Sequence, residues 1–296
     1  MGDTPPYAAL DTLPSAKPHT SPQSTCDSAP EMQNSGPLVS VVIPTRHRLD
    51  LLQRAINSVN NQHYANIDII VVDNASDAPL CRTQLSSQRP LKVVRTETMK
   101  LLPSTRNFGA AHSKAPFISF LDDDDEILPC KLSSHMQAFS VDPSLDYVYG
   151  DTRQVSTNGD TIMMSSGPID LVHFLHWRYI HTNALTLRRS VFDALQYSAD
   201  MSTYEDIEFT ARLMRAYKGH HIKQVHAVWN RDNRPDQMTR RNYRRAYENW
   251  GRLCDRFDDI ISADKGLRRF YHRKMLALSV MFGDLRQAMI SMRKII

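Results

Sequence analysis

Carboxylates are concentrated at one point of the sequence, where four consecutive aspartates, Asp122 to Asp125, are followed by Glu126. They close an apolar run, Phe117 to Leu121, that has the length and composition of a buried strand. Like charges a few ångströms apart repel one another, and a divalent cation relieves that repulsion. Mg²⁺ and Mn²⁺ prefer oxygen ligands, and Mg²⁺ usually binds through one or two carboxylates together with substrate phosphates. The run therefore indicates a metal-assisted site for a nucleoside diphosphate, with a solvated acidic turn as the alternative.

Two further apolar runs also end in polar residues. Leu38 to Ile43 is closed by Pro44 and Thr45, and Ile67 to Val72 is closed by Asp73. Both runs are rich in β-branched residues, which is typical of strands buried on both faces. Ligands of open α/β sheets bind beyond the carboxyl ends of the strands, so these polar residues and Asp122 are expected to share one site.

Helical and strand patterns alternate along the chain around these three runs. Asp50 and Gln53 resemble a capping box at the start of a helix whose apolar face carries Leu52, Ala55, Ile56 and Val59. Further strands are expected at 91–94, 147–149 and 182–187, and further helices at 104–113, 206–217 and through most of 238–296. This order predicts an α/β fold with a mostly parallel central sheet and a C-terminal helical appendage.

Composition narrows the class of protein. The 296 residues are enough for a sizeable core, and the four cysteines are too scattered to indicate a zinc site or a disulfide framework. A reducing cytoplasm is the simplest compartment for them. No apolar stretch has the length of a transmembrane helix, and the N-terminus lacks the apolar core of a signal peptide.

The net charge of +4 is unevenly distributed. From Asn233 onward Lys and Arg exceed Asp and Glu by eight, so the preceding part carries a net −4. A basic, amphipathic helical segment can dock on an anionic membrane surface, or it can pack as a cap on the rest of the protein or on a partner subunit. Nucleic-acid binding is not expected, because the arginines are not interleaved with an aromatic platform.

Five motifs follow one another along the chain: Val39–Thr45, Val71–Asp77, Arg106–Asn107, Phe120–Asp125 and Glu205–Asp206. Their order and spacing resemble the family 2 glycosyltransferases over roughly residues 38–235. The resemblance implies a Rossmann-like nucleotide-binding domain of the GT-A type. It also implies inverting transfer from a nucleotide sugar with Mn²⁺ or Mg²⁺ as cofactor.

Composition, periodicity and the resemblance together divide the chain into three parts. Residues 1–36, rich in Pro, Ser and Thr, are a disordered lead-in. Residues 37–237 form the catalytic domain, with a nucleotide-binding half at 37–126 and an acceptor half at 127–237. Residues 238–296 form the basic helical region.

Roles for nucleotide binding follow from the same resemblance. Pro44, Thr45 and Arg46 would line the nucleotide pocket. Asp73 would accept a hydrogen bond from the imide N–H of uracil or thymine, the alternative being a turn cap. Arg106 would support base or phosphate, the alternative being a surface salt bridge.

The acidic run matches the D-x-D-D pattern of the family as Asp122, Asp124 and Asp125, with Asp123 in the variable position beside the nucleotide. Asp122 and Asp125 would support the ribose of the nucleotide or the metal shell. Asp124 is the expected main metal ligand, and the register is open by one residue because all four positions are Asp. The metal would neutralise charge on the leaving diphosphate.

Acceptor-side roles fall on Glu205 and Asp206. Asp206 is the expected general base toward the acceptor hydroxyl, and Glu205 is its neighbour or an acceptor contact. The alternative is that both serve as ordinary first-turn charges of a helix.

A diphosphate clamp is expected from Arg231 and Arg234, with Asn233 where many relatives have a histidine. His226, set among apolar residues, is expected to be a strand histidine rather than a ligand. Trp177 would stack on an acceptor sugar or pack within an amphipathic segment.

These expectations add up to a cytoplasmic, metal-dependent inverting glycosyltransferase, peripheral to the membrane if its tail docks there. The expected donor is a UDP-hexose and the expected acceptor a glycan, a glycolipid or a small molecule. Two rivals are a sugar-nucleotide nucleotidyltransferase, against which the glycine-free segment Pro44–Arg48 counts, and a catalytically silent nucleotide-binding scaffold that acts through its basic tail.

Overall fold

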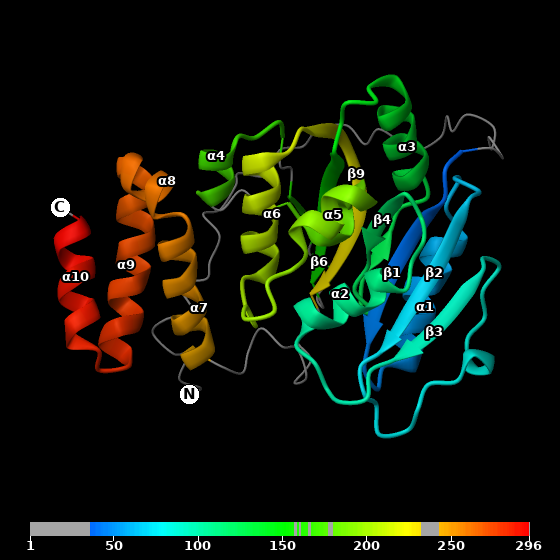
Figure 1. Ribbon diagram of the computed structural model, residues 1–296, viewed down its shortest axis with the longest axis horizontal. Coiled ribbons are helices and arrows are strands. Elements are labelled where there is room, and N and C mark those ends of the chain that lie inside the picture. The colour runs from blue at the N-terminus through cyan, green and yellow to red at the C-terminus, as the bar shows by residue number, and fades with distance from the viewer. Residues whose placement is uncertain are drawn as a thin grey trace.

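The computed structural model describes residues 36–156, 159, 161–164, 167–176, 180–231 and 243–295, without the side chains of 162–164 and 243. The expected lead-in, apart from Gly36, lies outside this part of the chain, as do Trp177, Asn233 and Arg234. One twisted sheet is covered by helices on both faces, and a stack of helices extends from one side of it (Figure 1).

The first half of the sheet is parallel, as the apolar runs predicted. Its strand order is β3-β2-β1-β4, with β1 at Val39–Thr45, β2 at Ile67–Asp73, β3 at Leu91–Arg95 and β4 at Phe117–Phe120. Helices α1 (Leu49–Asn60) and α2 (Leu102–Ala111) connect these strands. Thr45 and Asp73 are paired at the carboxyl ends of β1 and β2, so this edge collects the polar residues.

The second half of the sheet is mixed. Among the described strands, β8 (Leu185–Arg188) runs antiparallel to β4, and the order continues through β6 (Tyr147–Ser156) and β9 (Gly219–Arg231) to β5 (Glu126–Ile127), while β7 (Thr161–Met164) pairs with β6. The helices of this half are α3 at Lys131–Val141, α4 at Leu171–Leu175, α5 at Arg189–Leu195 and α6 at Glu205–Ala216.

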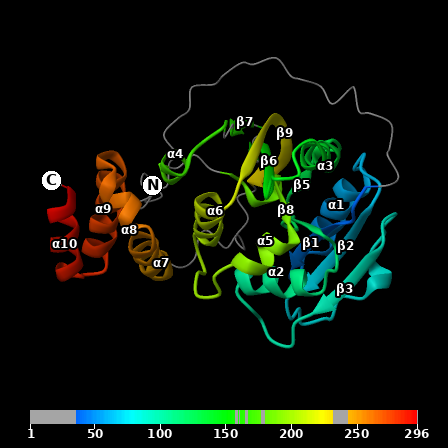
Figure 2. The same ribbon diagram turned by 45° about the horizontal axis from the view of Figure 1, so that its top comes forward.

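Two apolar cores lie on the two faces of the sheet. Helices α1 and α3 cover one face, and α2, α5 and α6 cover the other (Figure 2). The second core continues beyond α6 into the C-terminal helices, where Trp250 and Tyr271 stack at 4.6 Å and are fully buried. The C-terminal helices therefore share the core of the α/β domain.

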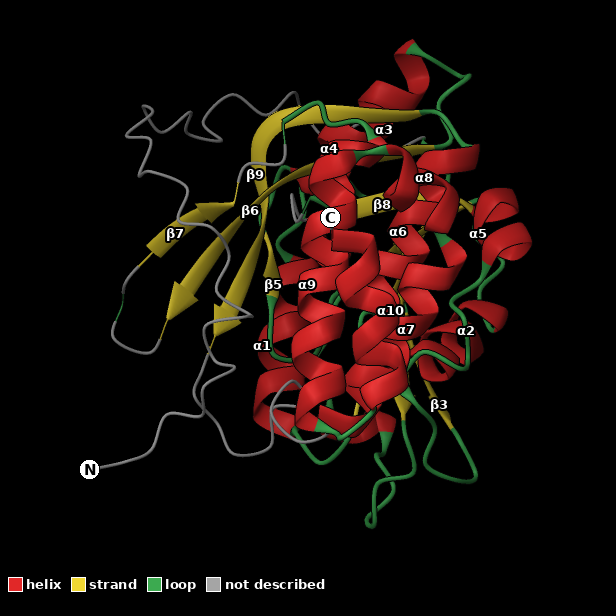
Figure 3. Ribbon diagram, turned by 90° about the vertical axis from the view of Figure 1, so that its left-hand side faces the viewer, coloured by secondary structure: helices red, strands yellow, loops and turns green. Residues whose placement is uncertain are grey.

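These helices are α7 (Tyr243–Arg256), α8 (Asp258–Ala263), α9 (Lys265–Met281) and α10 (Leu285–Ile295). They form successive layers beside α6, with α10 outermost (Figures 1 and 3). None of the helices in the described part of the chain combines the length and apolar character that a bilayer span requires.

Two local expectations were wrong in detail. Helix α1 begins at Leu49 after Arg48, with no side-chain cap, because the Gln53 amide instead bonds Asn57 Oδ1 and the backbone of Ser86. The strand expected at 182–187 begins as a 3₁₀ turn, Thr182–Ala184, and only then becomes β8.

Candidate active site at the carboxyl edge of the sheet

The aspartate run after β4 alternates in exposure. The side chains of Asp122 and Asp124 are 24% and 19% exposed, whereas those of Asp123 and Asp125 are 8% and 2% exposed. The sequence could not distinguish four identical residues, but the structure separates a solvent-facing pair from a buried pair.

The two buried aspartates are held by neighbouring loops. Asp123 accepts hydrogen bonds from Thr45 Oγ1 at 2.7 Å and from Arg48 Nη1 at 3.2 Å. Asp125 accepts from Asn183 Nδ2 at 2.6 Å and from the Asn230 backbone at 2.8 Å. Burial raises the pKa of Asp123 to about 7 and that of Asp125 well above its ordinary value. Both carboxyls therefore organise the loop through hydrogen bonds.

Arginines compensate the carboxylate charge of the outward pair. Arg48 Nη1 lies 3.1 Å from Asp124 Oδ2, and Arg106 Nη2 lies 2.6 Å from Asp122 Oδ1. Burial alone would raise the pKa of Asp122, but the Arg106 charge holds it below its ordinary value. Asp122 is thus ionised at neutral pH.

Arg106 joins the two halves of the site. Its side chain is 3% exposed, which excludes the surface salt bridge considered from the sequence. Besides Asp122 it contacts Glu205 Oε1 at 3.5 Å, and its guanidinium lies 5.2 Å from the centre of the Tyr197 ring. The neighbouring Asn107 bonds the backbone N and O of Tyr197, so one motif fixes both the arginine and its aromatic support.

Glu205 and Asp206 occupy the first turn of α6, after Tyr204 in a left-handed conformation with φ of 60°. Burial and the charge of Asp206 raise the pKa of Glu205 to about 7, while Arg106 opposes this shift. Nearby His181 is 5% exposed, and burial lowers its pKa although the charges of Asp122 and Asp206 act in the opposite direction. The two acidic motifs, about eighty residues apart in sequence, therefore face a common volume.

The expected nucleotide residues line the adjoining strand ends. Asp73 is fully buried and accepts from the backbone N–H groups of Ser76 and Leu80 and from Arg95. These bonds lower its pKa against the effect of burial, and they are the contacts of a turn cap. Arg46, which follows Pro44 and Thr45, is 41% exposed and contacts Met99 and Asp77.

Metal-ligand candidates are fewer than the sequence suggested. In the described part of the chain, no three His, Cys, Asp or Glu side chains converge as a metal site. Asp125 is occupied by Asn183 and Asn230, which leaves Asp122 and Asp124 as outward carboxylates. Two carboxylates suffice for Mg²⁺ when substrate phosphates and water complete the shell.

Two other predicted residues, Arg231 and His226, lie on β9. Arg231, at the end of β9, is exposed and lies over Trp229 at 5.8 Å. His226 is a fully buried strand residue whose ring hydrogen-bonds His135 at 2.9 Å.

Sequence reasoning gave no role to four residues that shape the site, namely Arg48, His181, Asn183 and Tyr197. Asn183 is the clearest case, since its Oδ1 accepts from the Asp122 backbone and its Nδ2 donates to Asp125. It reaches the aspartates from a loop about sixty residues away, and no local pattern marks such a contact.

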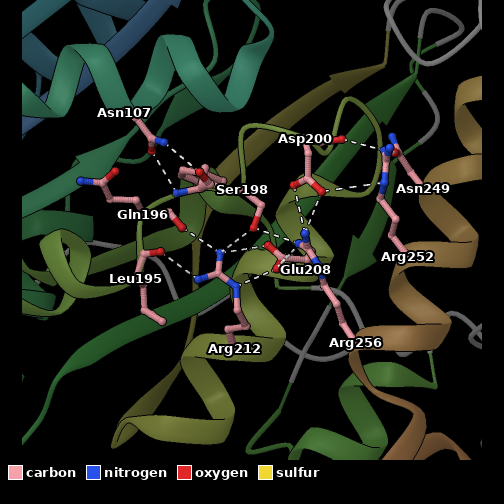
Figure 4. Close-up of polar contacts among 11 residues, drawn as sticks. Asn107, Leu195, Gln196, Ser198, Asp200, Glu208, Arg212, Asn249, Arg252 and Arg256 are labelled. Atoms are coloured by element: carbon pink, nitrogen blue, oxygen red, sulfur yellow. Dashed lines mark hydrogen bonds and ion pairs between the residues drawn. The ribbon is translucent and has the colours of Figure 1, made fainter.

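A polar network beside the site ties α6 to α7 (Figure 4). Fully buried Glu208, one turn after Glu205, accepts from Arg212 Nε at 2.7 Å and from Arg256 Nη1 at 2.6 Å. Arg256 also pairs with Asp200, and Arg212 binds the carbonyls of Leu195 and Gln196. A hollow of about 350 Å³ lies at this junction rather than over Asp122, lined by Ser198, Glu208, Arg212, Arg215, Arg256 and Phe257. The guanidinium groups of Arg212, Arg215 and Arg256 are all paired with carboxylates, so the network indicates bracing rather than ligand binding.

Comparison with known proteins places the geometry in context. Residues 40–201 match the family model described as glycosyl transferase family 2. An uncharacterised glycosyltransferase of Haemophilus influenzae is 30% identical over 112 residues, which are 38% of each chain. A GalNAc(5)-diNAcBac-PP-undecaprenol β-1,3-glucosyltransferase of Campylobacter jejuni is 38% identical over 106 residues, 34% of each chain. The chain thus spans little more than a third of the length of these two relatives.

Two further similarities concern substrates and fold. A UDP-Glc:α-D-GlcNAc-diphosphoundecaprenol β-1,3-glucosyltransferase of Escherichia coli is 27% identical over 122 residues, which are 41% of this chain and 48% of that one. Residues 1–349 of TarS from S. aureus, in complex with UDP-GlcNAc, superpose with a TM-score of 0.61 at 18% identity, covering 86% of this chain and 79% of TarS 1–349. This likeness confirms the predicted GT-A type of fold.

Proposed function

We propose that this chain, which belongs to glycosyl transferase family 2, transfers a hexose from a nucleotide sugar to a hydroxyl of a lipid-linked glycan, with inversion at the anomeric carbon. The observation that carries the proposal is Arg106, which joins Asp122 at the end of β4 to Glu205 at the start of α6. This pair of contacts supports a shared site in which Asp122 would serve the donor and Glu205 the acceptor.

The relatives support the choice of donor and acceptor. Two of them are named as glucosyltransferases acting on undecaprenol-diphosphate glycans, one of these with UDP-Glc, and the TarS structure contains UDP-GlcNAc. We therefore propose UDP as the nucleotide. We also propose a cytoplasmic setting, where free thiols such as those of Cys81, Cys130 and Cys254 stay reduced. Thr45, Arg46 and Asp73 lie where the nucleoside would bind, and Asp73 would accept from the uracil imide only after releasing one of its present donors.

Asp206 is the proposed general base. It lies on the first turn of α6 beside Glu205, within electrostatic range of His181. A carboxylate there would take the proton of the acceptor hydroxyl as its oxygen attacks the sugar from the face opposite the diphosphate. Arg106 and Glu205 would hold this helix end against the donor side.

Asp122 and Asp124 are the residues proposed to hold Mg²⁺ or Mn²⁺. Such an ion supplies Lewis-acid neutralisation of the leaving diphosphate. Arg48, paired with Asp124, and exposed Arg231 would contribute positive charge toward the same phosphates.

The first test is UDP release from a panel of UDP-sugars, with a lipid-linked acceptor, under Mn²⁺, Mg²⁺ or EDTA. We expect UDP release with one donor in the presence of Mn²⁺ or Mg²⁺, and we expect EDTA to abolish that release. We expect Asp206→Asn to lower kcat by about 10²–10⁴-fold with UDP binding retained. We also expect Asp124→Ala to lower turnover by about 10²-fold or more.

Asp193→Asn is the matched control, because Asp193 is a carboxylate of α5 whose side chain is 52% exposed and pairs with Arg189 of the same helix. It should leave turnover within twofold of the wild type. Binding of UDP without release from any donor would favour the silent scaffold, and failure to bind any nucleoside diphosphate would contradict the proposal. Formation of a nucleotide sugar from a sugar phosphate would identify a nucleotidyltransferase instead.

A further inference from the structure

Exposed apolar side chains gather on the outermost helices. Ten large hydrophobic side chains are exposed in the described part of the chain, and seven of them lie between Val280 and Met292. A concentration of this kind marks an interaction surface, whereas singly scattered apolar residues need no explanation.

The apolar residues of α10 form a stripe. Leu285, Met289 and Met292 follow helical spacing and are 73%, 54% and 53% exposed. Arg286, Ile290 and Arg293 form a second exposed stripe beside the first. We call these six residues the outer face of α10; the helix lies outermost in the stack, as Figures 1 and 3 show.

The opposite side of α10 packs against the rest of the protein. Ala288 and Ser291 are buried, and Asp284 just before the helix accepts a hydrogen bond from Tyr247 of α7 at 2.8 Å. Phe282 stacks on the same tyrosine at 5.5 Å. The helix is therefore fixed with its apolar stripe outward, which separates two roles that the sequence left as alternatives. Helices α7 to α9 act as the cap, and α10 presents a surface.

The positive charge of this surface indicates what kind of partner it binds. Between Lys265 and Ile295 the chain has eight Lys and Arg but one acidic residue, Asp284. Of these cations Lys274 is buried and Lys294 pairs with Asp258, so the other six carry the charge of the surface. Arg286 and Arg293 flank the apolar stripe, and Arg269 and Arg273 of α9 are exposed as well. A second copy docked by the same face would bring these arginines against their own counterparts, which is unfavourable. An anionic lipid surface satisfies both the charge and the apolar stripe.

We propose that α10 docks on an anionic membrane, with Leu285, Met289 and Met292 inserted at the boundary between headgroups and acyl chains. Arg286 and Arg293 then contact lipid phosphates along one side of the stripe. Methionine and leucine suit a fluid, irregular environment of this kind. The inference rests on the proposed function, because docking would bring the enzyme close to a lipid-linked acceptor. Its test measures membrane binding and involves no turnover.

The test is cosedimentation of the full chain with vesicles of phosphatidylcholine alone or mixed with phosphatidylglycerol. We expect binding to the mixed vesicles only, and weaker binding as salt rises. The triple variant Leu285→Ser, Met289→Ser, Met292→Ser should need about tenfold more lipid or more for half-binding. The double variant Arg286→Gln, Arg293→Gln should fall in the same range.

Val141→Ser is the matched control, because Val141 is 79% exposed at the end of α3 and should leave vesicle binding unchanged. UDP binding by each variant reports that the donor site is folded. Equal binding of wild type and triple variant would overturn the proposal. So would a dimer in sedimentation velocity that the triple variant abolishes without any binding to vesicles, since the occupant would then be a second copy.

Discussion

At the scale of single residues, the site depends on how charge is divided among adjacent carboxylates. Asp122 and Glu205 share Arg106, yet their pKa values shift in opposite directions. Asp122 has the closer contact with the arginine, 2.6 Å against 3.5 Å, and is held ionised. Glu205 has Asp206 as its neighbour, so burial and repulsion together keep its proton near neutral pH.

This difference predicts a pH dependence of activity. Glu205, with a pKa of about 7, is charged only above that pH, so its ion pair with Arg106 forms as pH rises from 6 to 8. We expect kcat/KM for acceptor to rise by about tenfold per pH unit below the inflection. In Glu205→Gln the inflection near pH 7 should disappear.

The measurement is a pH–rate profile of wild type and Glu205→Gln at saturating UDP-sugar. Asp123, whose pKa burial also raises to about 7, is the competing source of such an inflection. An inflection that persists in Glu205→Gln would transfer the assignment to Asp123.

At this scale the sequence could predict residues that a local pattern marks, but not residues whose contacts depend on the fold. Thr45, Asp73 and Asp122 were predicted together because each ends an apolar strand and parallel strands share a carboxyl edge. Asn183 and Arg48 were not singled out, because their contacts with the aspartates join segments brought together only by the fold. The division into outward and buried aspartates had no sequence signal either, since the four residues are identical.

At the scale of elements, the sheet changes from parallel to mixed strand pairing after β4. The parallel half could be predicted from continuous apolar runs with helices between them. The mixed half could not be predicted in the same detail, because β9 and β5 are short of apolar signal and pair across a long sequence separation. The Asp50–Gln53 capping box was wrong for a related reason, since a tertiary contact with Ser86 engaged the glutamine.

Helix α3 packs on this mixed half through a buried polar contact. His135 of α3 bonds Thr186 of β8 at 2.9 Å and His226 of β9 at 2.9 Å, with buried Lys131 one turn away. Burial and neighbouring positive charge lower the pKa of His226 to about 3 and that of His135 well below its ordinary value. Both histidines are therefore neutral in the folded protein at neutral pH.

A dependence of stability on pH follows. In the unfolded chain these histidines take up protons below about pH 6.5, whereas the folded chain does not. The contribution is fully present above pH 6.5 and is lost as pH falls toward 3, at up to about 2.7 kcal/mol per pH unit for two histidines.

Urea unfolding at pH 7, 6 and 5 checks this dependence. His135→Gln keeps a hydrogen-bonding side chain but cannot titrate, so its free energy of unfolding should fall less steeply with pH. A slope equal to that of the wild type would assign the loss to other groups.

At the scale of the whole molecule, the C-terminal helices are joined to the catalytic domain by a continuous core and by the network of Figure 4. Arg256 of α7 reaches fully buried Glu208 of α6, whereas Arg215 of α6 pairs with Asp259 of α8 at the surface. The two pairs join the same regions of the chain but differ in burial.

Removing the buried contact should therefore matter more. We expect Arg256→Ala to lower the free energy of unfolding by about 1–3 kcal/mol, because Glu208 keeps only Arg212. Arg215→Ala should cost less than about 1 kcal/mol. Chemical denaturation of both variants checks the difference, and equal effects would show that Arg256 acts as an ordinary surface partner.

The layering of the C-terminal helices also determines how far the carboxylates of α6 lie from a membrane on which α10 docks. With α10 on a bilayer, α9, α7 and α6 follow in turn (Figure 1), so the helical stack stands between the membrane and Glu205 and Asp206, which begin α6. A hydroxyl attached directly to a lipid diphosphate would lie well below them. If α10 docks on the membrane as proposed, the stack would favour acceptors long enough to reach from the lipid to these carboxylates.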